Sequence, residues 1–262
     1  MGSDQPMKFD LEWLRSQVPD RQIEWHDAID STMTEASQLA AAGGPAGTVI
    51  GAEEQTAGQG RHGRSWHSEP CSGLYLSIIL RRKFAPAALP VVTLALGLAV
   101  REAILKAADL VCDLRWPNDV LIPSNNCEGK CAGVLTQLES SAIIAGIGIN
   151  VNHSSFPAEL SNIATSLRIA SGRVQSRERL LLELLASIDT YCDLLEMQGR
   201  GAVIETFARA SSYVSGRRVC VHQDGSQLRG TTAGLNHSGF LMLRGDDGVN
   251  SVIVAGGVRP CS

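Results

Sequence analysis

The sequence lacks the surplus of basic residues that proteins lying along nucleic acids carry. Its 262 residues include 23 Lys and Arg against 27 Asp and Glu, which gives a formal net charge of −4. Phosphate binding must therefore be local. Lysine is scarce, and three of the four lysines lie among residues typical of a solvated surface: Lys8, Lys83 and Lys106. Lys130 begins an apolar segment and requires its own explanation.

Paired CxxC motifs and long apolar runs are also missing. Seven cysteines are scattered in an odd count, so we expect reduced thiols in a cytoplasmic protein. Cys127 and Cys131 lie close together, but no third and fourth ligand for a zinc ion stand nearby. The longest apolar run, residues 89–100, is broken at Arg101, and the N-terminus is polar. The sequence thus predicts neither a membrane span nor a secretory signal.

The chain is long enough to bury an ordinary hydrophobic core in one large domain or two modest ones. Hydrophobic periodicity predicts helices over residues 32–43, 89–110 and 177–197, the first of them capped by Ser31 or Thr32. Strand-like runs are predicted at 48–53, 74–80, 113–116, 130–138 and 142–151. Beyond about residue 213, short β-like runs at 218–222, 228–235, 240–243 and 251–254 alternate with glycines, which indicates a small barrel.

Residues 54–66 are the most informative segment. Three glycines leave backbone amides free, and Arg61 and Arg64 supply planar cationic groups that match phosphate or carboxylate oxygens. The glycines also fit the dinucleotide pattern GxGxxG, but residues 65–70 cannot open the helix that this pattern requires. The loop composition therefore favours an anion-binding site, with an exposed Arg/Gly hairpin as an equal alternative.

Three further motifs place polar residues or glycines at predicted strands. Asn118 and Asp119 follow a proline on a turn, where they cap the next element or face a cleft with a hard cation. Lys130 begins a strand, either beside an anionic partner or at a solvated edge. Glycines alternate along residues 146–151, so a backbone or a flat ligand must pack closely on that face.

Taken in series, these motifs resemble the biotin protein ligase family, from about residue 26 to residue 260. The matching segments are Asp30-Ser31-Thr32, the Gly/Arg loop, Trp116-Pro117-Asn118-Asp119, Gly129-Lys130, Gly133-Val134-Leu135, and residues 146–151, 164–167 and 255–259. The resemblance implies a ligase that activates biotin with ATP as biotinyl-5′-AMP and releases pyrophosphate. A lysine of a biotin carboxyl carrier protein then accepts the biotin.

The resemblance also implies a fold. It is of the α+β class: a catalytic domain with a mixed sheet flanked by helices, related to class II aminoacyl-tRNA synthetases, precedes a small SH3-like β-barrel. We expect an N-terminal extension over residues 1–25, the catalytic domain over 26–212 and the barrel over 213–262. Twenty-five residues are too few for the DNA-binding domain of the family's repressors, so DNA is not an expected partner. Homodimer formation is left open.

Site residues follow from the same resemblance. Biotin is expected to contact Ser31, Thr32, Met33, Gln55, Gln59, Gly60, Arg61 and Lys130. ATP or the adenylate is expected to contact Arg61, Arg64, Trp66, Asn118 and Asn150. Lys130, Arg61 and Asp119 are the expected catalytic residues, because positioned cations must bring two anions together. Asp119 is in addition the expected ligand of the Mg²⁺ that accompanies ATP.

Two positions depart from the family pattern. Met33 stands where Asn or Gln is usual, and Gln59 replaces the first arginine of the glycine loop. We expect weaker electrostatic retention of the adenylate but not loss of activity, because Arg61 and Arg64 are present. A Met33→Asn substitution is expected to be tolerated.

Three alternatives stay open. A lipoate protein ligase shares the architecture and the adenylation chemistry, but its pocket must hold an apolar dithiolane, whereas Ser31, Thr32 and Gln55 suit a ureido ring. A nucleic-acid-binding module would use the Arg/Gly loop and the barrel, against the acidic balance of charge. The third alternative is an adenylate-binding protein that has lost its transfer activity.

Overall fold

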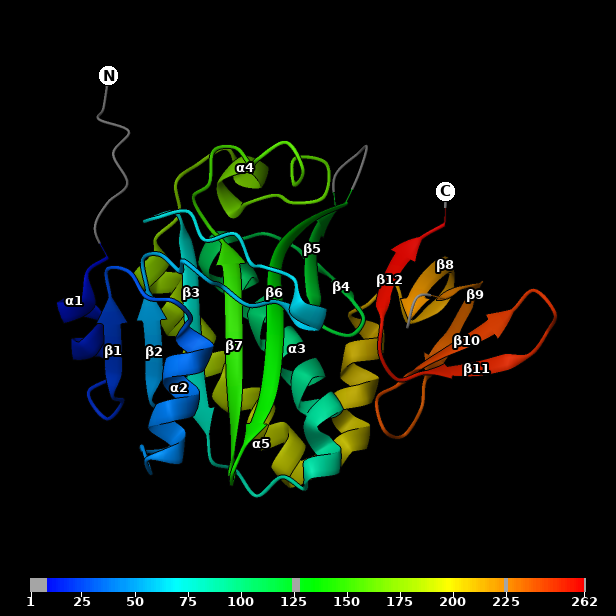
Figure 1. The fold of residues 1–262 in the computed structure, drawn as a ribbon, viewed down its shortest axis with the longest axis horizontal. Coiled ribbons are helices and arrows are strands. Elements are labelled where there is room, and N and C mark those ends of the chain that lie inside the picture. The colour runs from blue at the N-terminus through cyan, green and yellow to red at the C-terminus, as the bar shows by residue number, and fades with distance from the viewer. Residues whose placement is uncertain (1–8, 124–127, 224–225, 262) are drawn as a thin grey trace.

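The computed structural model describes residues 9–123, 128–223 and 226–261. Lys8, Cys127 and the loop residues 124–126 lie outside this part of the chain. Two sheets account for the strands (Figure 1). The larger sheet comprises β1 (Ile23–His26), β2 (Val49–Ala52), β3 (Gly73–Leu80), β4 (Asp113–Arg115), β5 (Asp119–Pro123), β6 (Glu128–Glu139) and β7 (Ala142–Asn150). The smaller sheet comprises β8 (Ser215–Gln223), β9 (Ser226–Leu235), β10 (Leu241–Gly245), β11 (Asn250–Ile253) and β12 (Gly257–Pro260).

The larger sheet is mixed, as expected, with the strand order β1-β2-β3-β7-β6-β5-β4. β1 and β2 run parallel, whereas every other neighbouring pair is antiparallel. The helices α3 (Leu89–Ala108) and α5 (Arg177–Arg209) cover one face, and α2 (Thr32–Ala41) lies on the opposite face (Figure 1). The functional site described below lies on the face of α2.

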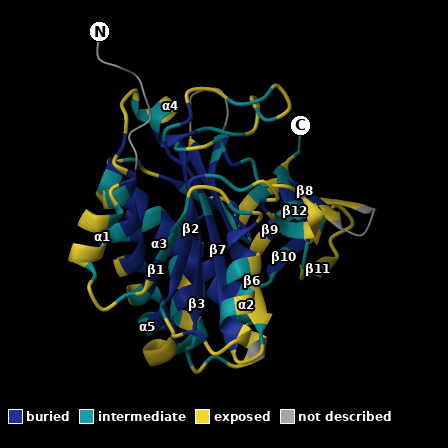
Figure 2. Cartoon of the chain, turned by 60° about the vertical axis from the view of Figure 1, so that its left-hand side comes forward, coloured by how far each residue is buried: buried dark blue, intermediate teal, exposed yellow. Residues whose placement is uncertain are grey.

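Burial explains the composition of these elements. All eight residues of β3 are buried, because helices cover the sheet on both faces (Figure 2). α3 packs against both the sheet and α5, so most of its apolar residues belong to the main core. Among the described residues, no helix combines the length and the apolar character needed to cross a membrane.

α5 is longer than the sequence predicted. Its apolar face runs as expected from Arg177, but the helix continues past Met197 to Arg209. Gly199 interrupts it with φ of 80° and ψ of −176°, a conformation that glycine adopts at little cost. The periodicity is broken at this kink, which explains why the pattern indicated an earlier end.

The described part of the predicted N-terminal extension packs into the catalytic unit. α1 (Leu11–Gln17) contacts α5, and Leu14 is fully buried in the main core. The ring of Phe9 stacks on Trp25, with centroids 3.9 Å apart and planes 4° apart. Residues 9–25 therefore contribute to the core, and the boundary near residue 26 stays a prediction. The short helix α4 (Leu167–Ser171) and two 3-10 turns, at Arg61–Gly63 and Pro86–Ala88, complete the larger unit.

The smaller sheet is antiparallel, with the order β11-β10-β9-β8-β12, consistent with a small barrel. The sequence predicted four of its strands and missed β12. Its apolar residues join the same core cluster as α3, so one core extends through both sheets. Trp116 also connects them, because its indole Nε1 donates a buried hydrogen bond of 2.9 Å to the carbonyl of Gly239. The boundary near residue 213 stays a prediction.

The expectation that all cysteines are reduced thiols is wrong for one pair. Cys220 and Cys261 form a disulfide across 41 residues, with Cα atoms 5.2 Å apart. β12 pairs with β8 and sets Arg259 opposite Cys220, which brings the nearby Cys261 within reach. Sequence spacing alone could not reveal this contact. The other described cysteines, Cys71, Cys112, Cys131 and Cys192, are free.

Candidate active site

A cavity of about 50 Å³ lies where the Gly/Arg loop crosses β6 and β7 beside the N-terminus of α2. Most of the residues predicted from the sequence line it: Thr32, Met33, Gln55, Gln59, Gly60, Arg61, Trp66, Asn118 and Lys130. The remaining lining residues are Leu76, Gly133, Val134, Leu135, Gly146, Ile147 and Gly148. Ser31, Arg64, Asp119 and Asn150 do not line it. The structure therefore brings segments distant in sequence to one place.

One part of the cavity wall is a chain of hydrogen bonds centred on Thr32. Gln55 Oε1 accepts from the amide of Thr32 at 2.9 Å and from its hydroxyl at 3.1 Å. Because that hydroxyl donates to Gln55, it accepts from the Ser77 hydroxyl, 2.9 Å away. Gln55 Nε2 donates to Ser68 Oγ at 3.3 Å. These contacts orient donors and acceptors at the start of α2, where free amides favour polar ligands.

Ser31 begins α2 without the predicted side-chain cap. Its backbone occupies the N-cap position, but its hydroxyl makes no cap hydrogen bond, and the hydroxyl of Thr32 is bonded to Gln55 instead. Ser31 is 2% exposed, and its Oγ has no hydrogen-bond partner among the described residues. A buried hydroxyl without a partner is costly. Ser31 thus has unused hydrogen-bonding capacity beside the cavity.

The Gly/Arg loop is a hairpin that also forms part of the cavity. Gln59 pairs with Ser65, and the amide of Gly60 donates to the carbonyl of Arg64 at 2.7 Å. Arg61 begins a 3-10 turn, and its Nη1 donates to Asn118 Oδ1 at 3.2 Å. The loop is therefore a hairpin that presents a cation to the cavity, and anion binding by it stays a prediction.

Asn118 connects Arg61 to the sheet. Its Nδ2 donates to the carbonyl of Val134 at 2.9 Å, and its own carbonyl accepts from the Val134 amide at 3.0 Å. Burial lowers the pKa of Arg61, an effect that Arg64 reinforces and Asp119 opposes. Desolvated positive charge at a cavity wall attracts anions more strongly than the same charge in water.

Lys130 lies beside an anionic partner, one of the two alternatives for this residue. Its Nζ is 2.6 Å from Asp119 Oδ1, and it lies 5.0 Å from the ring centroid of Trp66. Asp119 Oδ2 accepts from Arg115 at 2.7 Å. Burial alone would raise the pKa of Asp119, but the charges and hydrogen bonds of Lys130 and Arg115 prevail and lower it to about 2. Asp119 therefore holds the Lys130 amine at the cavity.

These contacts do not fit the predicted magnesium site. Both carboxylate oxygens of Asp119 are bonded to cations, and Asp119 does not line the cavity. A hydrated Mg²⁺ ion needs carboxylate oxygens that are free to face the solvent or a phosphate. We therefore correct the expectation and assign Asp119 the role of positioning Lys130.

Side chains occupy the face that the alternating glycines leave open. A Cβ atom at Gly148 would lie 2.4 Å from Trp66 Cε2, and one at Gly146 would lie 2.5 Å from Met33 Sδ. Gly133, opposite Gly148 on β6, would clash less severely with the same indole, at 3.0 Å. The sequence predicted close packing by a backbone or a flat ligand. Trp66 and Met33 fill that role in this structure.

Asn150 and Arg64 also lie outside the cavity wall, like Ser31 and Asp119. Asn150 donates through Nδ2 to the carbonyls of Lys130 and Thr165, at 3.3 and 3.1 Å, so it holds the backbone from which Lys130 projects. Arg64 is exposed, and its Nη2 lies 3.6 Å from the position of a Cβ atom on Gly257 in β12. It therefore reaches toward the second sheet rather than into the cavity.

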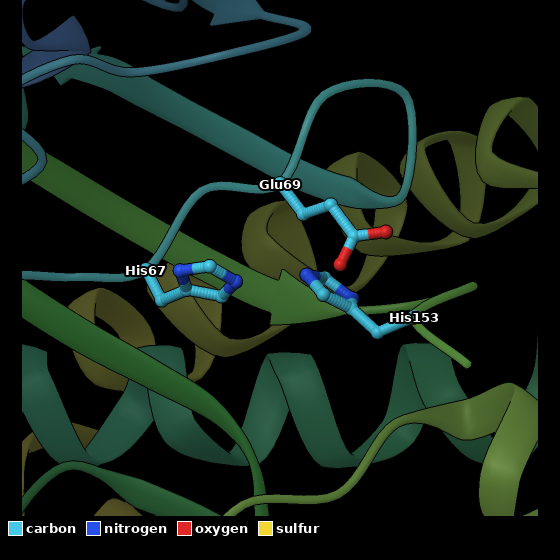
Figure 3. A group of neighbouring side chains, drawn as sticks. All are labelled: His67, Glu69 and His153. Atoms are coloured by element: carbon cyan, nitrogen blue, oxygen red, sulfur yellow. The ribbon is translucent and has the colours of Figure 1, made fainter. Parts of the chain in front are cut away.

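The sequence missed several residues of this region. Arg259 of β12 lies among the charges around Asp119: burial lowers its pKa, as do Arg115 and Arg64. Arg259 belongs to the matching segment 255–259, but the resemblance gave it no role at the site. A second missed group, His67, Glu69 and His153, adjoins the loop after Trp66 (Figure 3). Burial lowers the pKa of His153 to about 4, so its ring is neutral near pH 7.

Comparison with known proteins supports the resemblance. Residues 25–154 match the Biotin/lipoate A/B protein ligase family. A biotin--[acetyl-CoA-carboxylase] ligase of Mycobacterium tuberculosis is 32% identical over 260 residues, covering 95% of this chain and 94% of that protein. The bifunctional ligase/repressor BirA of Bacillus subtilis is 32% identical over 250 residues, covering 92% of this chain and 75% of that protein.

Solved structures agree with the sequence relatives. The biotin protein ligase of Aquifex aeolicus in complex with biotin and ATP superposes with a TM-score of 0.81 at 29% identity. The match covers 92% of this chain and 99% of that one, so it includes both sheets. The relatives are 32% identical over more than nine tenths of the chain, and the solved structure matches it over the same extent. The chain therefore belongs to the biotin protein ligase family.

Proposed function

We propose that the chain is an ATP-dependent biotin protein ligase that forms biotinyl-5′-AMP and transfers biotin to a lysine of a biotin carboxyl carrier protein. The observation that carries the proposal is the composition of one cavity. It combines the hydrogen-bonding set around Thr32, an apolar wall along β7, and the cations Arg61 and Lys130. Biotin combines a ureido ring, an apolar body and a carboxylate, and each part has a counterpart in this cavity.

In the first step, a carboxylate oxygen of biotin attacks the α-phosphorus of ATP, and the bond to pyrophosphate breaks. Two anions must approach each other, so the main barrier is electrostatic. Arg61 is held by Asn118, and Lys130 is held by Asp119. Both cations are therefore oriented before the substrates arrive, which reduces the reorganisation needed at the transition state.

In the second step, the neutral amine of a carrier lysine attacks the acyl carbon of the adenylate. The carbon–oxygen bond to AMP breaks and its electron pair leaves with AMP, an amide forms, and the proton of the amine passes to solvent water. The same cations stabilise the negative charge that develops on the departing phosphate. Lys130 acts through its charge in this scheme and forms no covalent bond to biotin.

In the proposed scheme, Trp66 moves when biotin binds. A cavity of about 50 Å³ accommodates no more than a few water molecules, whereas the indole lies on the glycines of β6 and β7. Its Nε1 is buried without a hydrogen-bond partner among the described residues, so the closed position leaves one donor unsatisfied. Displacement of the loop exposes the glycine face to the ligand.

Mg²⁺ enters the proposal only with ATP, since Asp119 does not fit as its ligand. The cytoplasmic location, the absence of DNA binding and the oligomeric state stay predictions.

The test is a mass measurement on a biotin carboxyl carrier domain incubated with this protein, biotin and Mg-ATP. We expect the mass to increase by one biotin, with release of pyrophosphate, and no increase for a carrier whose acceptor lysine is replaced by arginine. Replacing biotin with lipoate on a lipoyl carrier domain distinguishes the alternative ligase. Lipoylation without biotinylation would overturn the proposal, and adenylate formation without transfer would indicate the third alternative.

A further inference from the structure

Three side chains with metal-ligating atoms meet beside the loop that carries Trp66. His67 and Glu69 belong to this loop, whereas His153 follows the end of β7. One ligand atom from each of the three lies within 4.8 Å of the other two. Figure 3 shows the His67 ring and the Glu69 carboxylate directed toward the ring of His153. None of these residues takes part in the ligase mechanism described above.

Hydrogen bonds fix the state of the His153 ring. The Tyr75 hydroxyl donates to the backbone carbonyl of Glu69 at 3.0 Å and lies 3.1 Å from His153 Nε2. Because the hydroxyl has a single hydrogen, the imidazole must be the donor in the second contact. The neutral ring then carries a lone pair on Nδ1, which is buried and has no partner among the described residues. Such an unsatisfied buried atom is typical of places that take up water or an ion.

Neighbouring groups orient two of the three side chains. Ser72 donates to Glu69 Oε1 at 2.8 Å. The His153 ring is fully buried and stacks on Phe156, with centroids 5.0 Å apart and planes 13° apart. Outer hydrogen bonds and packing of this kind hold metal ligands in place in characterised sites. The cluster is therefore organised around His153 rather than formed by chance contact of surface side chains.

We propose that the chain binds one zinc ion through His67, Glu69 and His153. Two imidazoles and a carboxylate are the donor set of zinc sites that keep a fourth position for water. Zinc–ligand distances place the ligands of a tetrahedral site roughly 3.4 Å apart, so the cluster must contract by about an ångström. His67 and Glu69 are half-exposed residues of a loop, whereas His153 is fixed, so this movement falls on the loop.

The proposed zinc site lies next to the loop residue that covers the cavity, Trp66. His67 directly follows Trp66, whose indole lies on Gly148. A zinc ion bridging His67 and His153 would connect the Trp66 loop to the end of β7. It would thereby restrict the loop that moves on biotin binding in the proposed function.

The test uses the full chain after treatment with a chelator. Zinc chloride is titrated in a calorimeter, and cobalt(II) chloride is titrated with visible absorption as the readout. We expect saturation at one equivalent, and at least about tenfold weaker binding for His67→Ala and Glu69→Gln. Both substitutions alter half-exposed loop side chains, so the fold is expected to persist. Cys71→Ser removes the free thiol of the same loop, and His237→Ala removes an exposed imidazole elsewhere; both should bind zinc like the wild type.

A thermal measurement supplies an independent readout. Saturating zinc should raise the Tm of the wild type, because it binds the folded state, and raise that of the two ligand variants less. The proposal is overturned if zinc does not saturate the wild type, if His67→Ala and Glu69→Gln bind it equally well, or if Cys71→Ser is the variant that loses binding.

Discussion

The indole of Trp66 lies where any side chain at Gly148 would have to be. A Cβ atom at Gly148 would approach Trp66 Cε2 to 2.4 Å, and the ring is rigid, so the clash cannot be relieved by rotating a flexible end. The glycine is therefore required by the closed position of the loop.

Gly148→Ala is expected to displace the loop, with a loss of about 1–3 kcal/mol in the free energy of unfolding. It is also expected to raise the KM for biotin by about tenfold or more, because the added methyl group stands on the glycine face that the proposed ligand must occupy. Steady-state kinetics and denaturant unfolding measure both. Gly97→Ala in the interior of α3 is the matched control: its Cβ would meet Phe207 at an ordinary 3.7 Å. The control should be neutral or stabilised by up to about 1 kcal/mol. Equal behaviour of the two variants would contradict the packing argument.

Lys130→Ala and Arg61→Ala should each lower the rate of adenylate formation by about a hundredfold or more, because each removes a charge positioned at the cavity. Pyrophosphate exchange measures the rate, and circular dichroism checks that the fold persists. Lys106→Ala is the control, since its amine forms an exposed pair with Glu102 on α3. Normal exchange in both cavity variants would refute their assigned roles.

Asp119→Asn is expected to lower kcat while leaving the Mg²⁺ concentration for half-maximal rate unchanged. The carboxylate positions Lys130 and Arg115, so its loss disorders the amine rather than a metal ion. Kinetics across a range of Mg²⁺ concentrations separates the two roles. A large increase in the Mg²⁺ requirement would restore the metal assignment made from the sequence.

The ion pairs of Asp119 also predict that the stability of the fold depends on pH. The pKa of Asp119 falls from its ordinary 3.8 to about 2 in the folded protein. Its carboxylate therefore stabilises the fold above about pH 4, and this contribution, about 2 kcal/mol, is lost as the pH falls toward 2. The free energies of unfolding of the wild type and Asp119→Asn should converge over this interval. A constant difference would show that the ion pairs do not carry the effect.

Met33→Asn is now expected to destabilise the protein, contrary to the tolerance that the sequence comparison indicated. Met33 is 4% exposed and packs in an apolar cluster with Ala36 and Ile144, directly over Gly146. An amide without a partner there costs about 1–3 kcal/mol, whereas Met33→Leu should cost less than about 1.5 kcal/mol. Thermal unfolding of Met33→Asn and Met33→Leu tests this prediction. Equal Tm values for the two variants would support the expectation that Met33→Asn is tolerated.

Much of the fold was predictable because periodicity and glycine placement follow burial. The buried helix α3, the strands β3 and β7, and the long helix α5 all appeared as regular apolar patterns. β12 was missed because its four residues, two of them glycine and proline, carry no alternation. The Cys220–Cys261 contact depended on the pairing of β12 with β8, which no local pattern reveals.

The sequence could indicate which residues belong to the site, but not which partners their side chains contact. Arg61 and Lys130 were conspicuous as cations within glycine-rich or apolar segments. The role of Asp119 was not, since a carboxylate on a turn looks the same whether it faces a metal ion or two cations. His153 escaped notice for a similar reason: its partners His67 and Glu69 are more than eighty residues away in sequence.

The hydrogen bond from Trp116 to Gly239 ties the turn that carries Asn118 to the smaller sheet. Asn118 in turn holds Arg61, so the C-terminal unit helps to fix the position of the charge that we propose acts in catalysis. Removing that unit would leave every cavity-lining side chain in the polypeptide. The turn that positions Asn118, and through it the Arg61 guanidinium, would however lose its hydrogen bond to Gly239.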